Sequence, residues 1–423
     1  MEINLPTAYL KEMKEILGER FPLLLDAYAF EPLMAMRIND LKISPAHFRE
    51  MSPWPLQQVA WCPSGFYYDK KDKPGLHPFH EAGLYYIQEA SAMKAVEALE
   101  VKPGELVLDL CAAPGGKATQ IAAKLEGKGL LVANELVNSR AVALIQNLER
   151  LGVRNSLVLS ERPEKLAAEL SGFFDKILID APCSGSGMFR KNPKVIDQYH
   201  DNQPQRCAKQ QKKILSSAAV LLKGGGRLVY STCSFSKIEN EEVIDWFLTE
   251  HPEYELLKQE KLWPFEIAGE GHFVAALKKK GESRATNVPK RTTDKKKTKI
   301  INDWLAANRI DFSLDIIRVL DNRIIMINDR FPELKKLKVL SCGLALGTMK
   351  GETFIPHHWL AKALPGQLDL TENQLREYLR GEELTGNQTN RWLTVGIKGY
   401  SLGWVKVTNG KLKNHFPKGL WQR

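Results

Sequence analysis

The chain has 423 residues, 43% hydrophobic and 26% charged, which is typical of a globular protein of two or three domains. Charges interrupt its apolar runs before the ~20 residues that a membrane helix needs, and no secretory signal begins the chain, so we expect a cytoplasmic protein that contacts no membrane. The net charge of +10 favours a polyanionic partner, and the cysteines, which form no CxxC pair or zinc spacing, predict reduced thiols and no metal (Cys62, Cys111, Cys183, Cys207, Cys233 and Cys342).

Residues 1–98 are expected to form a small mixed α+β domain, because amphipathic helical spacing near the start is followed by short strand-like runs. Several aromatic residues of this segment stand among Lys and Arg (Trp54, Trp61, Tyr85 and Tyr86). Such side chains can stack on unpaired bases, or they can form the aromatic core of a small domain. The sequence leaves both interpretations open.

Residues 99–280 alternate between apolar strands and helices, which predicts a parallel, doubly wound α/β sheet. The expected strands are 106–110, 129–135, 156–160, 177–180 and 227–234, followed by two candidates at 254–257 and 273–277. A long helix is expected from about Gln203 to Leu222. The glycines at 224–226 predict its end.

The segment that follows the sheet is strongly basic. Residues 278–299 carry ten Lys or Arg and two acidic residues, a net charge of +8, without apolar periodicity. We expect a flexible linker over 281–300 that contacts phosphates or serves only as a spacer. Residues 301–423 are expected to form a β-rich RNA-binding module that ends in a hairpin over 399–414, with a type I′ turn at Asn409-Gly410.

A cofactor loop is predicted where the first strand of the sheet ends. Cys111-Ala112-Ala113-Pro114-Gly115-Gly116-Lys117 joins that strand to a helix, and Glu135 ends the second strand, 19 positions after Gly116. A carboxylate at that point can accept hydrogen bonds from ribose hydroxyls. The adjacent glycines match neither G-x-G-x-x-G nor a Walker loop. A cofactor with a ribose but no pyrophosphate fits better, and S-adenosylmethionine is the obvious candidate.

Two cysteines and a carboxylate are expected at one edge of the sheet. Asp180 and Cys183 follow the fourth strand and Cys233 follows the fifth, so all three side chains should open into one crevice. Two thiols beside a methyl donor suggest methylation of cytosine C5, a poor nucleophile until a thiolate adds to C6. Asp180, protonated or bridged by hydrogen bonds, could favour charge at N3, and Lys117 could supply the positive charge that activates a thiol. From this chemistry alone, Cys183 is the natural first choice as nucleophile.

Three separated motifs resemble the Nol/Nop/Sun family of RNA cytosine-5 methyltransferases. They are the loop 111–117, Asp180-Ala181-Pro182-Cys183-Ser184-Gly185, and Ser231-Thr232-Cys233-Ser234 with Glu239-Asn240-Glu241 shortly after. Residues 83–89 are similar to the lead-in segment of the family. The length and the C-terminal module are similar to the bacterial members that methylate small-subunit ribosomal RNA, which implies a PUA-like fold for that module.

The resemblance implies a role for each motif residue. Cys233 would be the nucleophile, which reverses the first choice, and Cys183 would help to remove the proton and release the product. Glu135 would hold the ribose, the loop 111–117 the methionine part, and Asp180 both cofactor and base. Arg140 is either a further cofactor contact or a solvated arginine. Ser160 stands near the position of the usual adenine-contacting acid, so the adenine contact is open between Ser160 and Glu161.

The sequence therefore predicts a Rossmann-like methyltransferase, active as a monomer on 16S ribosomal RNA or the small ribosomal subunit. Two alternatives stay open: a transfer RNA cytosine-5 methyltransferase, and a ribosome-assembly factor that binds RNA without catalysis.

Overall fold

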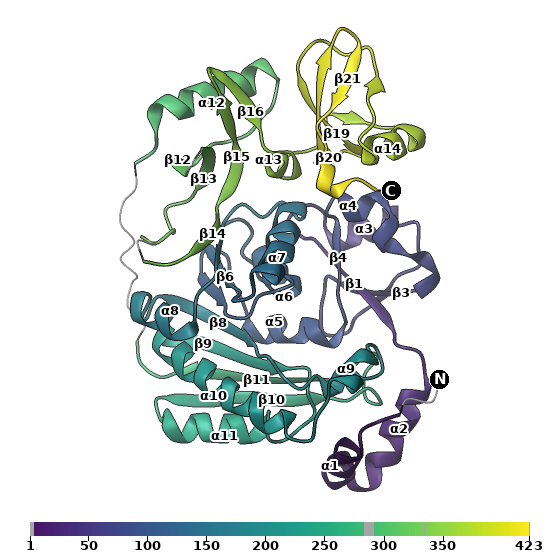
Figure 1. Ribbon diagram of the computed structural model, residues 1–423, viewed down its shortest axis with the longest axis vertical. Coiled ribbons are helices and arrows are strands. Elements are labelled where there is room, and N and C mark those ends of the chain that lie inside the picture. The colour runs from purple at the N-terminus through teal and green to yellow at the C-terminus, as the bar shows by residue number, and fades with distance from the viewer. Residues whose placement is uncertain (1–3, 283–291, 321, 334–335, 423) are drawn as a thin grey trace.

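A mixed eight-stranded sheet forms the centre of the protein in the computed structural model, which describes residues 4–282, 292–320, 322–333 and 336–422 (Figure 1). In spatial order its strands are β10 (Tyr254–Leu262), β11 (His272–Lys279), β9 (Leu222–Thr232), β8 (Phe174–Asp180), β5 (Leu106–Asp109), β6 (Leu130–Asn134), β7 (Ser156–Leu159) and β14 (Val339–Cys342). The five strands from β9 to β7 are parallel, and the other three are antiparallel to their neighbours.

Helices cover both faces of this sheet, because side chains of its buried strands alternate between two cores. Val107 of β5 packs in one core, whereas Leu106 and Leu108 pack in the other. The first core lies under α5 (Lys94–Leu99), α6 (Gly116–Lys124) and α7 (Asn138–Arg150), and the second under α8 (Pro163–Glu169), α10 (Gln203–Leu221) and α11 (Glu241–Glu250). The expected Rossmann-like, doubly wound sheet is confirmed.

The glycine run after α10 follows the predicted end of the helix. The helix ends at Leu221, as expected, and Gly224–Gly226 already lie inside strand β9. A Cβ on Gly226 would lie 2.8 Å from the side chain of Leu222 and 3.0 Å from the Asp175 carbonyl oxygen. The glycines are therefore needed for the close approach of neighbouring backbone, and the strand begins where the helix stops.

The N-terminal domain contains a four-stranded sheet in the order β2 (Gln57–Gln58), β3 (Gly65–Tyr68), β1 (Met34–Ile38) and β4 (Tyr85–Ile87), with α3 (Pro45–Met51) and α4 (Pro78–Glu81). Its aromatic residues serve mainly as core. Tyr85 is fully buried and donates to the Pro74 carbonyl oxygen, and the Trp61 indole donates to that of Ala90. The core interpretation of these aromatics is the one that the structure supports.

A helical hairpin, α1 (Thr7–Leu17) and α2 (Phe21–Ala29), precedes this sheet and stands apart from it beside α9 (Lys194–Asp197) (Figure 1). Tyr9, Leu24 and Tyr28 of the hairpin pack with Phe189 and Phe235 in one apolar cluster. The hairpin therefore rests on the loops that follow β8 and β9.

The basic segment is only partly a linker. Residues 278–279 belong to β11, and 295–299 begin helix α12 (Lys295–Ala307), where the Asp294 side chain caps the Lys297 N–H. Residues 283–291 lie outside the described part of the chain. The expectation of a structureless segment over 281–300 is thus wrong at its C-terminal end, because a capping aspartate and the apolar spacing of Ile301 and Leu305 favour a helix.

Two sheets, rather than one, follow α12. The first consists of β12 (Ile316–Leu320), β13 (Arg323–Ile327), β15 (Leu344–Lys350) and β16 (Thr353–Pro356), and between its strands the chain adds β14 to the central sheet. After α13 (His358–Lys362), the second sheet has the order β17 (Leu368–Asp369), β19 (Trp392–Ile397), β20 (Tyr400–Thr408), β21 (Lys411–Asn414), β18 (Leu384–Thr385), with α14 (Glu372–Leu379). The predicted hairpin is confirmed as β20–β21, with positive φ at Asn409 and Gly410.

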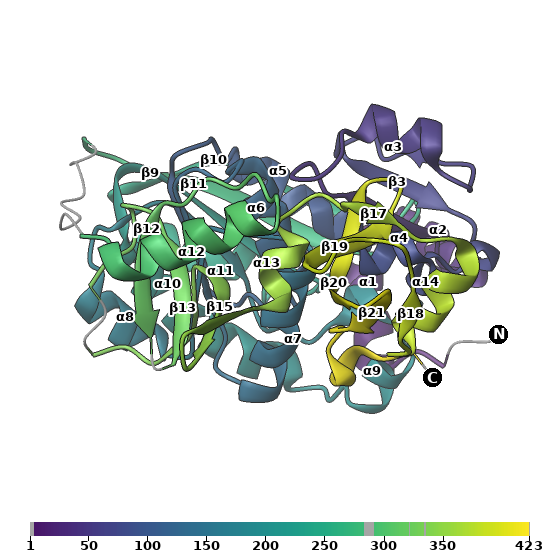
Figure 2. The same ribbon diagram turned by 90° about the horizontal axis from the view of Figure 1, so that it is seen from above.

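The second C-terminal sheet lies beside α4 of the N-terminal domain in both views (Figures 1 and 2). Leu393 and Val405 of this sheet share a core with Phe48 and Tyr85. The two ends of the chain therefore meet next to the central domain.

Among the described residues, no helix is long and apolar enough to cross a membrane. Within the same residues, no group of three or more His, Cys, Asp or Glu side chains is arranged to hold a metal ion.

Candidate active site

A cavity of about 820 Å³ opens where β5, β6, β8 and β9 end at their carboxyl edge, with Glu135, Asp180, Cys183 and Cys233 in its wall. Asp180 pairs with Ser231 in the register of β8 and β9, so the loops after both strands start side by side. The Sγ atoms of Cys183 and Cys233 lie 3.2 Å apart. The juxtaposition that the sequence predicts is thus present, at the edge where open α/β sheets bind ligands.

Asp180 is held as a carboxylate beside this pair of thiols. Its Oδ2 lies 2.8 Å from Lys117 Nζ, and its Oδ1 accepts from Ser231 Oγ at 3.0 Å and lies 3.7 Å from His272 Nε2. Burial alone would raise the pKa of Asp180, but Lys117 and His272 outweigh it and hold the pKa well below its usual range. Of the two predicted states of Asp180, the contacts with Lys117 and Ser231 favour the carboxylate that is bridged by hydrogen bonds.

The two cysteines differ in their surroundings. The hydrogen bond with Cys233 and the burial of the side chain raise the pKa of Cys183 well above its ordinary value. Cys183 is therefore a neutral thiol at physiological pH and can donate its S–H to Cys233. Burial lowers the pKa of Lys117, but the neighbouring Asp180 carboxylate outweighs burial, so the pKa of Lys117 is raised. Cys233 adds a smaller contribution in the same direction. A cation thus lies near the Cys233 sulfur.

The loop 111–117 contributes to the site in two ways. Cys111 and Ala113 line the cavity, whereas Lys117 reaches Asp180 from the helix behind it. The remaining members shape the turn and are fixed through their backbone: Ala112 N–H donates to Asn134, Pro114 and Gly116 accept from Asn147 and Arg37, and Gly115 has a φ of +112°.

Glu135 and its neighbours form the far end of the cavity. One carboxylate oxygen of Glu135 accepts from Val137 N–H at 2.8 Å, and the other lies 3.5 Å from Arg140 Nη1. Arg140 also donates to the Ala113 carbonyl oxygen and lines the cavity. Ser160 does not line it: its hydroxyl lies 3.5 Å from the Leu136 carbonyl oxygen, and Arg162 and Pro163 occupy this part of the wall.

Glu161 is engaged elsewhere. Its carboxylate binds Lys165 Nζ and the Lys338 N–H, each at 2.7 Å, so it is committed to tying α8 to the C-terminal region. At this end of the cavity, the apolar side chains of Leu136 and Val137 are each about half exposed.

These side chains fit S-adenosylmethionine. The cavity volume lies in the range that encloses a ligand of this size, and Glu135 offers a carboxylate to ribose hydroxyls. Leu136 and Val137 offer apolar surface to a planar base, and Asp180 lies at the opposite end beside the thiols. A ligand that spans these groups would point its reactive end at Cys183 and Cys233.

Asp109, the last residue of β5, directly precedes the cavity-lining Leu110, and its titration predicts how stability depends on pH. Burial, followed by the nearby Asp180 carboxylate, raises the pKa of Asp109 to about 7. Between pH ~4 and ~7 the folded protein therefore binds more protons here than the unfolded chain, so its free energy of unfolding falls as pH rises. Asp109→Asn should remove up to roughly 4 kcal/mol of this fall. Urea unfolding of the unaltered protein and of Asp109→Asn across this pH range measures the effect. A difference in free energy of unfolding that does not change with pH would contradict the raised pKa of Asp109.

Two site residues escaped the sequence reasoning. Arg37 of β1 is fully buried and donates to Gln88, Gly116 and Thr119, so the N-terminal domain anchors the glycine turn. His272 begins β11 and reaches Asp180, because that antiparallel strand starts where β9 ends. For Arg37, the sequence offered one indication: a charged residue in the middle of the apolar run 34–38.

This sheet order, with a cavity lined by Glu135 and Asp180 at the ends of its parallel strands, is that of a Rossmann-like methyltransferase that uses S-adenosylmethionine. Comparisons with known proteins agree. Residues 96–278 match the family model of the 16S rRNA methyltransferase RsmB/F, and 5–90 match the N-terminal domain of the 16S rRNA methyltransferase RsmF. Residues 303–364 match the first C-terminal domain of the RsmF rRNA methyltransferase, and 366–422 its PUA domain.

Relatives match over nearly the whole chain. Ribosomal RNA small subunit methyltransferase F of Shewanella piezotolerans is 32% identical over 93% of this chain and 92% of its own length. The protein of the same name from Vibrio vulnificus is 32% identical over 99% and 98%. A solved methyltransferase homologue from Pyrococcus horikoshii is 30% identical over 66% of this chain and 96% of its own, with a TM-score of 0.59. The chain belongs to the RsmF family of bacterial 16S rRNA methyltransferases.

Proposed function

We propose that the protein methylates C5 of cytosine in 16S ribosomal RNA through a covalent adduct between Cys233 and C6. The observation that carries this proposal is the 3.2 Å contact between two thiols from separate motifs, at the end of the cofactor cavity. Methylation of an exocyclic amine or a hydroxyl needs no such thiol pair. The proposal places the enzyme in the cytoplasm as a monomer.

The proposed roles of the two cysteines are those that the motif resemblance implies, and the contact between the two sulfurs is compatible with them. Cys233 Sγ adds to C6, and the electron pair of the C5–C6 double bond makes C5 nucleophilic toward the methyl group that the bound cofactor supplies. Water then takes the C5 proton, the electron pair of the C5–H bond re-forms the C5–C6 double bond, and the S–C6 bond breaks with its electron pair on Cys233 Sγ, which leaves as a thiolate. Cys183, held as a thiol beside Cys233, supports the proton transfers of this release.

Asp180 and Lys117 act as one unit in this proposal. The Asp180 carboxylate can accept from the 4-amino group of cytosine, while the Lys117 ammonium offsets negative charge that develops on the base and on the Cys233 sulfur. Cofactor contacts are assigned to the loop 111–117, Glu135 and Arg140, and the predicted contact of Ser160 is not retained, because Ser160 does not line the cavity.

The mouth of the cavity suits RNA. Basic side chains in its wall (Arg140, Arg162, Lys165 and Lys213) can contact phosphates on either side of a base drawn out of its stack.

Methyl transfer to RNA tests the proposal directly. Purified protein should transfer radiolabelled methyl groups from S-adenosylmethionine to 16S RNA, free or in the small subunit, and a deletion strain should lack 5-methylcytosine at the corresponding position. If the deletion strain instead lacks 5-methylcytosine in transfer RNA, the substrate is transfer RNA and not 16S RNA. Absence of transfer to any cellular RNA would contradict catalysis and favour an assembly factor.

A further inference from the structure

The motif Glu239-Asn240-Glu241 lies six to eight residues after Cys233, and its side chains return to the loops that carry both cysteines. Glu239 and Asn240 are fully buried. Neither lines the cavity, so neither is placed to touch cofactor or base. Burying a carboxylate is costly unless both of its oxygens have hydrogen-bond partners. The partners of Glu239 therefore indicate what this side chain does in the structure.

One carboxylate joins the two cysteine loops. Glu239 accepts from the Ser184 N–H at 2.8 Å, from the Ser184 hydroxyl, and from the Ser234 hydroxyl at 2.7 Å. Ser184 directly follows Cys183, and Ser234 directly follows Cys233. Gln211 of α10 also donates to Glu239 at 3.2 Å and to the Pro182 carbonyl oxygen at 3.0 Å, so the Pro-Cys corner is held from a second side.

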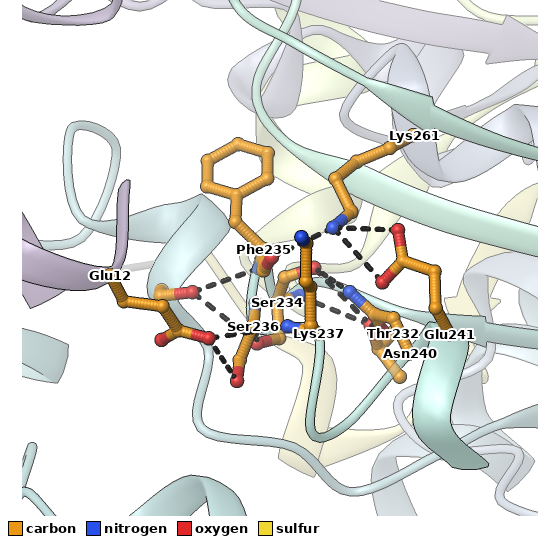
Figure 3. Close-up of polar contacts among 10 residues, drawn as sticks. Glu12, Thr232, Ser234, Phe235, Ser236, Lys237, Asn240, Glu241 and Lys261 are labelled. Atoms are coloured by element: carbon orange, nitrogen blue, oxygen red, sulfur yellow. Dashed lines mark hydrogen bonds and ion pairs between the residues drawn. The ribbon is translucent and has the colours of Figure 1, made fainter. Parts of the chain in front are cut away.

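Asn240 forms hydrogen bonds with Thr232 and Ser234, the residues on either side of Cys233 in the sequence (Figure 3 shows Asn240, Thr232 and Ser234). The Thr232 hydroxyl donates to Asn240 Oδ1 at 2.6 Å, and Asn240 Nδ2 donates to the Ser234 carbonyl oxygen at 2.8 Å. Lys261, paired with Glu241 at 3.0 Å, donates to the next carbonyl oxygen, that of Phe235, at 2.9 Å. The backbone on both sides of Cys233 is therefore fixed by the residues of this motif.

We infer that Glu239 and Asn240 are positioning residues with separate tasks. Asn240 fixes the Cys233 thiol for attack on C6, and Glu239 fixes the Cys183 loop against the Cys233 loop so that Cys183 can act in release. The inference rests on the proposed covalent mechanism. It assigns to Glu239 no proton transfer of its own.

The two tasks predict opposite effects on the covalent adduct. Glu239→Ala should slow release and accumulate protein–RNA adduct on denaturing gels, as Cys183→Ala should, while methyl transfer falls at least about tenfold. Asn240→Ala should slow formation of the adduct by a similar factor and accumulate none. Glu242→Ala, with an exposed side chain on the same helix start, is the matched control and should behave like the unaltered protein.

Conservative variants separate positioning from acid–base chemistry and from misfolding. Glu239→Gln keeps its oxygen for Ser184 N–H and Gln211 and turns its NH₂ to two hydroxyls, which can accept, so it should release product nearly normally. Ser184→Ala removes one hydroxyl and should accumulate adduct to a smaller extent. In the Cys183→Ala background, Glu239→Ala should slow release no further, because both changes remove the same assistance.

Comparison with Cys183→Ala distinguishes a failure of this inference from a failure of the proposed covalent mechanism. If Cys183→Ala accumulates no adduct, the proposed function fails whatever the other variants do. If it accumulates adduct but Glu239→Ala does not, the inference is wrong. It is also wrong if Glu239→Gln is as impaired as Glu239→Ala, or if Asn240→Ala accumulates adduct as Glu239→Ala does.

Discussion

Cys183→Ala is expected to leave much of the enzyme covalently joined to RNA, in a complex that survives denaturing electrophoresis. Cys233→Ala is expected to form none and to lose methyl transfer by at least roughly 10⁴-fold. The physical reason is the contact between the two sulfurs: the S–H of Cys183 lies 3.2 Å from the sulfur that must leave C6, but Cys183 itself is held neutral by burial and that hydrogen bond. A neutral thiol is a poor nucleophile.

The measurement uses radiolabelled RNA and S-adenosylmethionine with each purified variant, followed by separation of free and protein-bound RNA. Cys342→Ser on β14, in the sheet strand farthest from the thiol pair, is the control for removal of a cysteine and should retain both activity and a low level of adduct. If Cys183→Ala forms no adduct and Cys233→Ala does, the two roles must be exchanged.

Much of the site could be predicted because it depends on strand order. Residues at the ends of adjacent parallel strands must meet, so Asp180, Cys183 and Cys233 were brought together by the alternation of strands and helices alone. The same logic placed Glu135 opposite the thiols. Which cysteine attacks did not follow from that logic, since it depends on hydrogen bonds across loops.

Features that depend on distant segments escaped prediction. Arg37 supports the glycine turn from another domain, and β14 extends the central sheet from the C-terminal region. The glycines at 224–226 indicated only the end of the helix, and their place inside β9 depends on close packing against the Leu222 side chain and the Asp175 and Glu282 backbone. Local propensity carries no information about such neighbours.

The ion pair of Lys117 and Asp180 predicts the second large effect. Lys117→Met leaves the Asp180 carboxylate without its cation, and because this side chain is 33% exposed and partly screened by solvent, we expect a loss of roughly 1–3 kcal/mol in the free energy of unfolding. Methyl transfer should fall by roughly 10²-fold or more, since charge stabilisation beside the base is lost with the ammonium. Lys124→Met on the same helix removes a pair of equal length, 2.8 Å, whose lysine side chain is more exposed than that of Lys117 (28% against 9%), and it should cost about 1 kcal/mol or less.

The pH dependence gives the sign of this effect. In the unaltered protein the low pKa of Asp180 stabilises the fold above pH ~4, and that stabilisation is lost as pH falls through the folded pKa. The raised pKa of Lys117 stabilises it below pH ~10, and that contribution is lost as pH rises through its folded value. In Lys117→Met the ammonium no longer opposes burial and only His272 remains to lower the pKa of Asp180, so this pKa rises and the stabilisation present above pH ~4 becomes smaller.

The double variant Lys117→Met/Asp180→Asn separates folding from chemistry. Removing both charges should recover most of the lost stability, because no uncompensated charge stays buried. Methyl transfer should not recover, since the proposed contacts to the base are gone. Unfolding in urea and single-turnover transfer to RNA measure the two quantities on the same preparations. Recovery of activity together with stability would mean that the pair only holds the fold, and that neither side chain acts on the base.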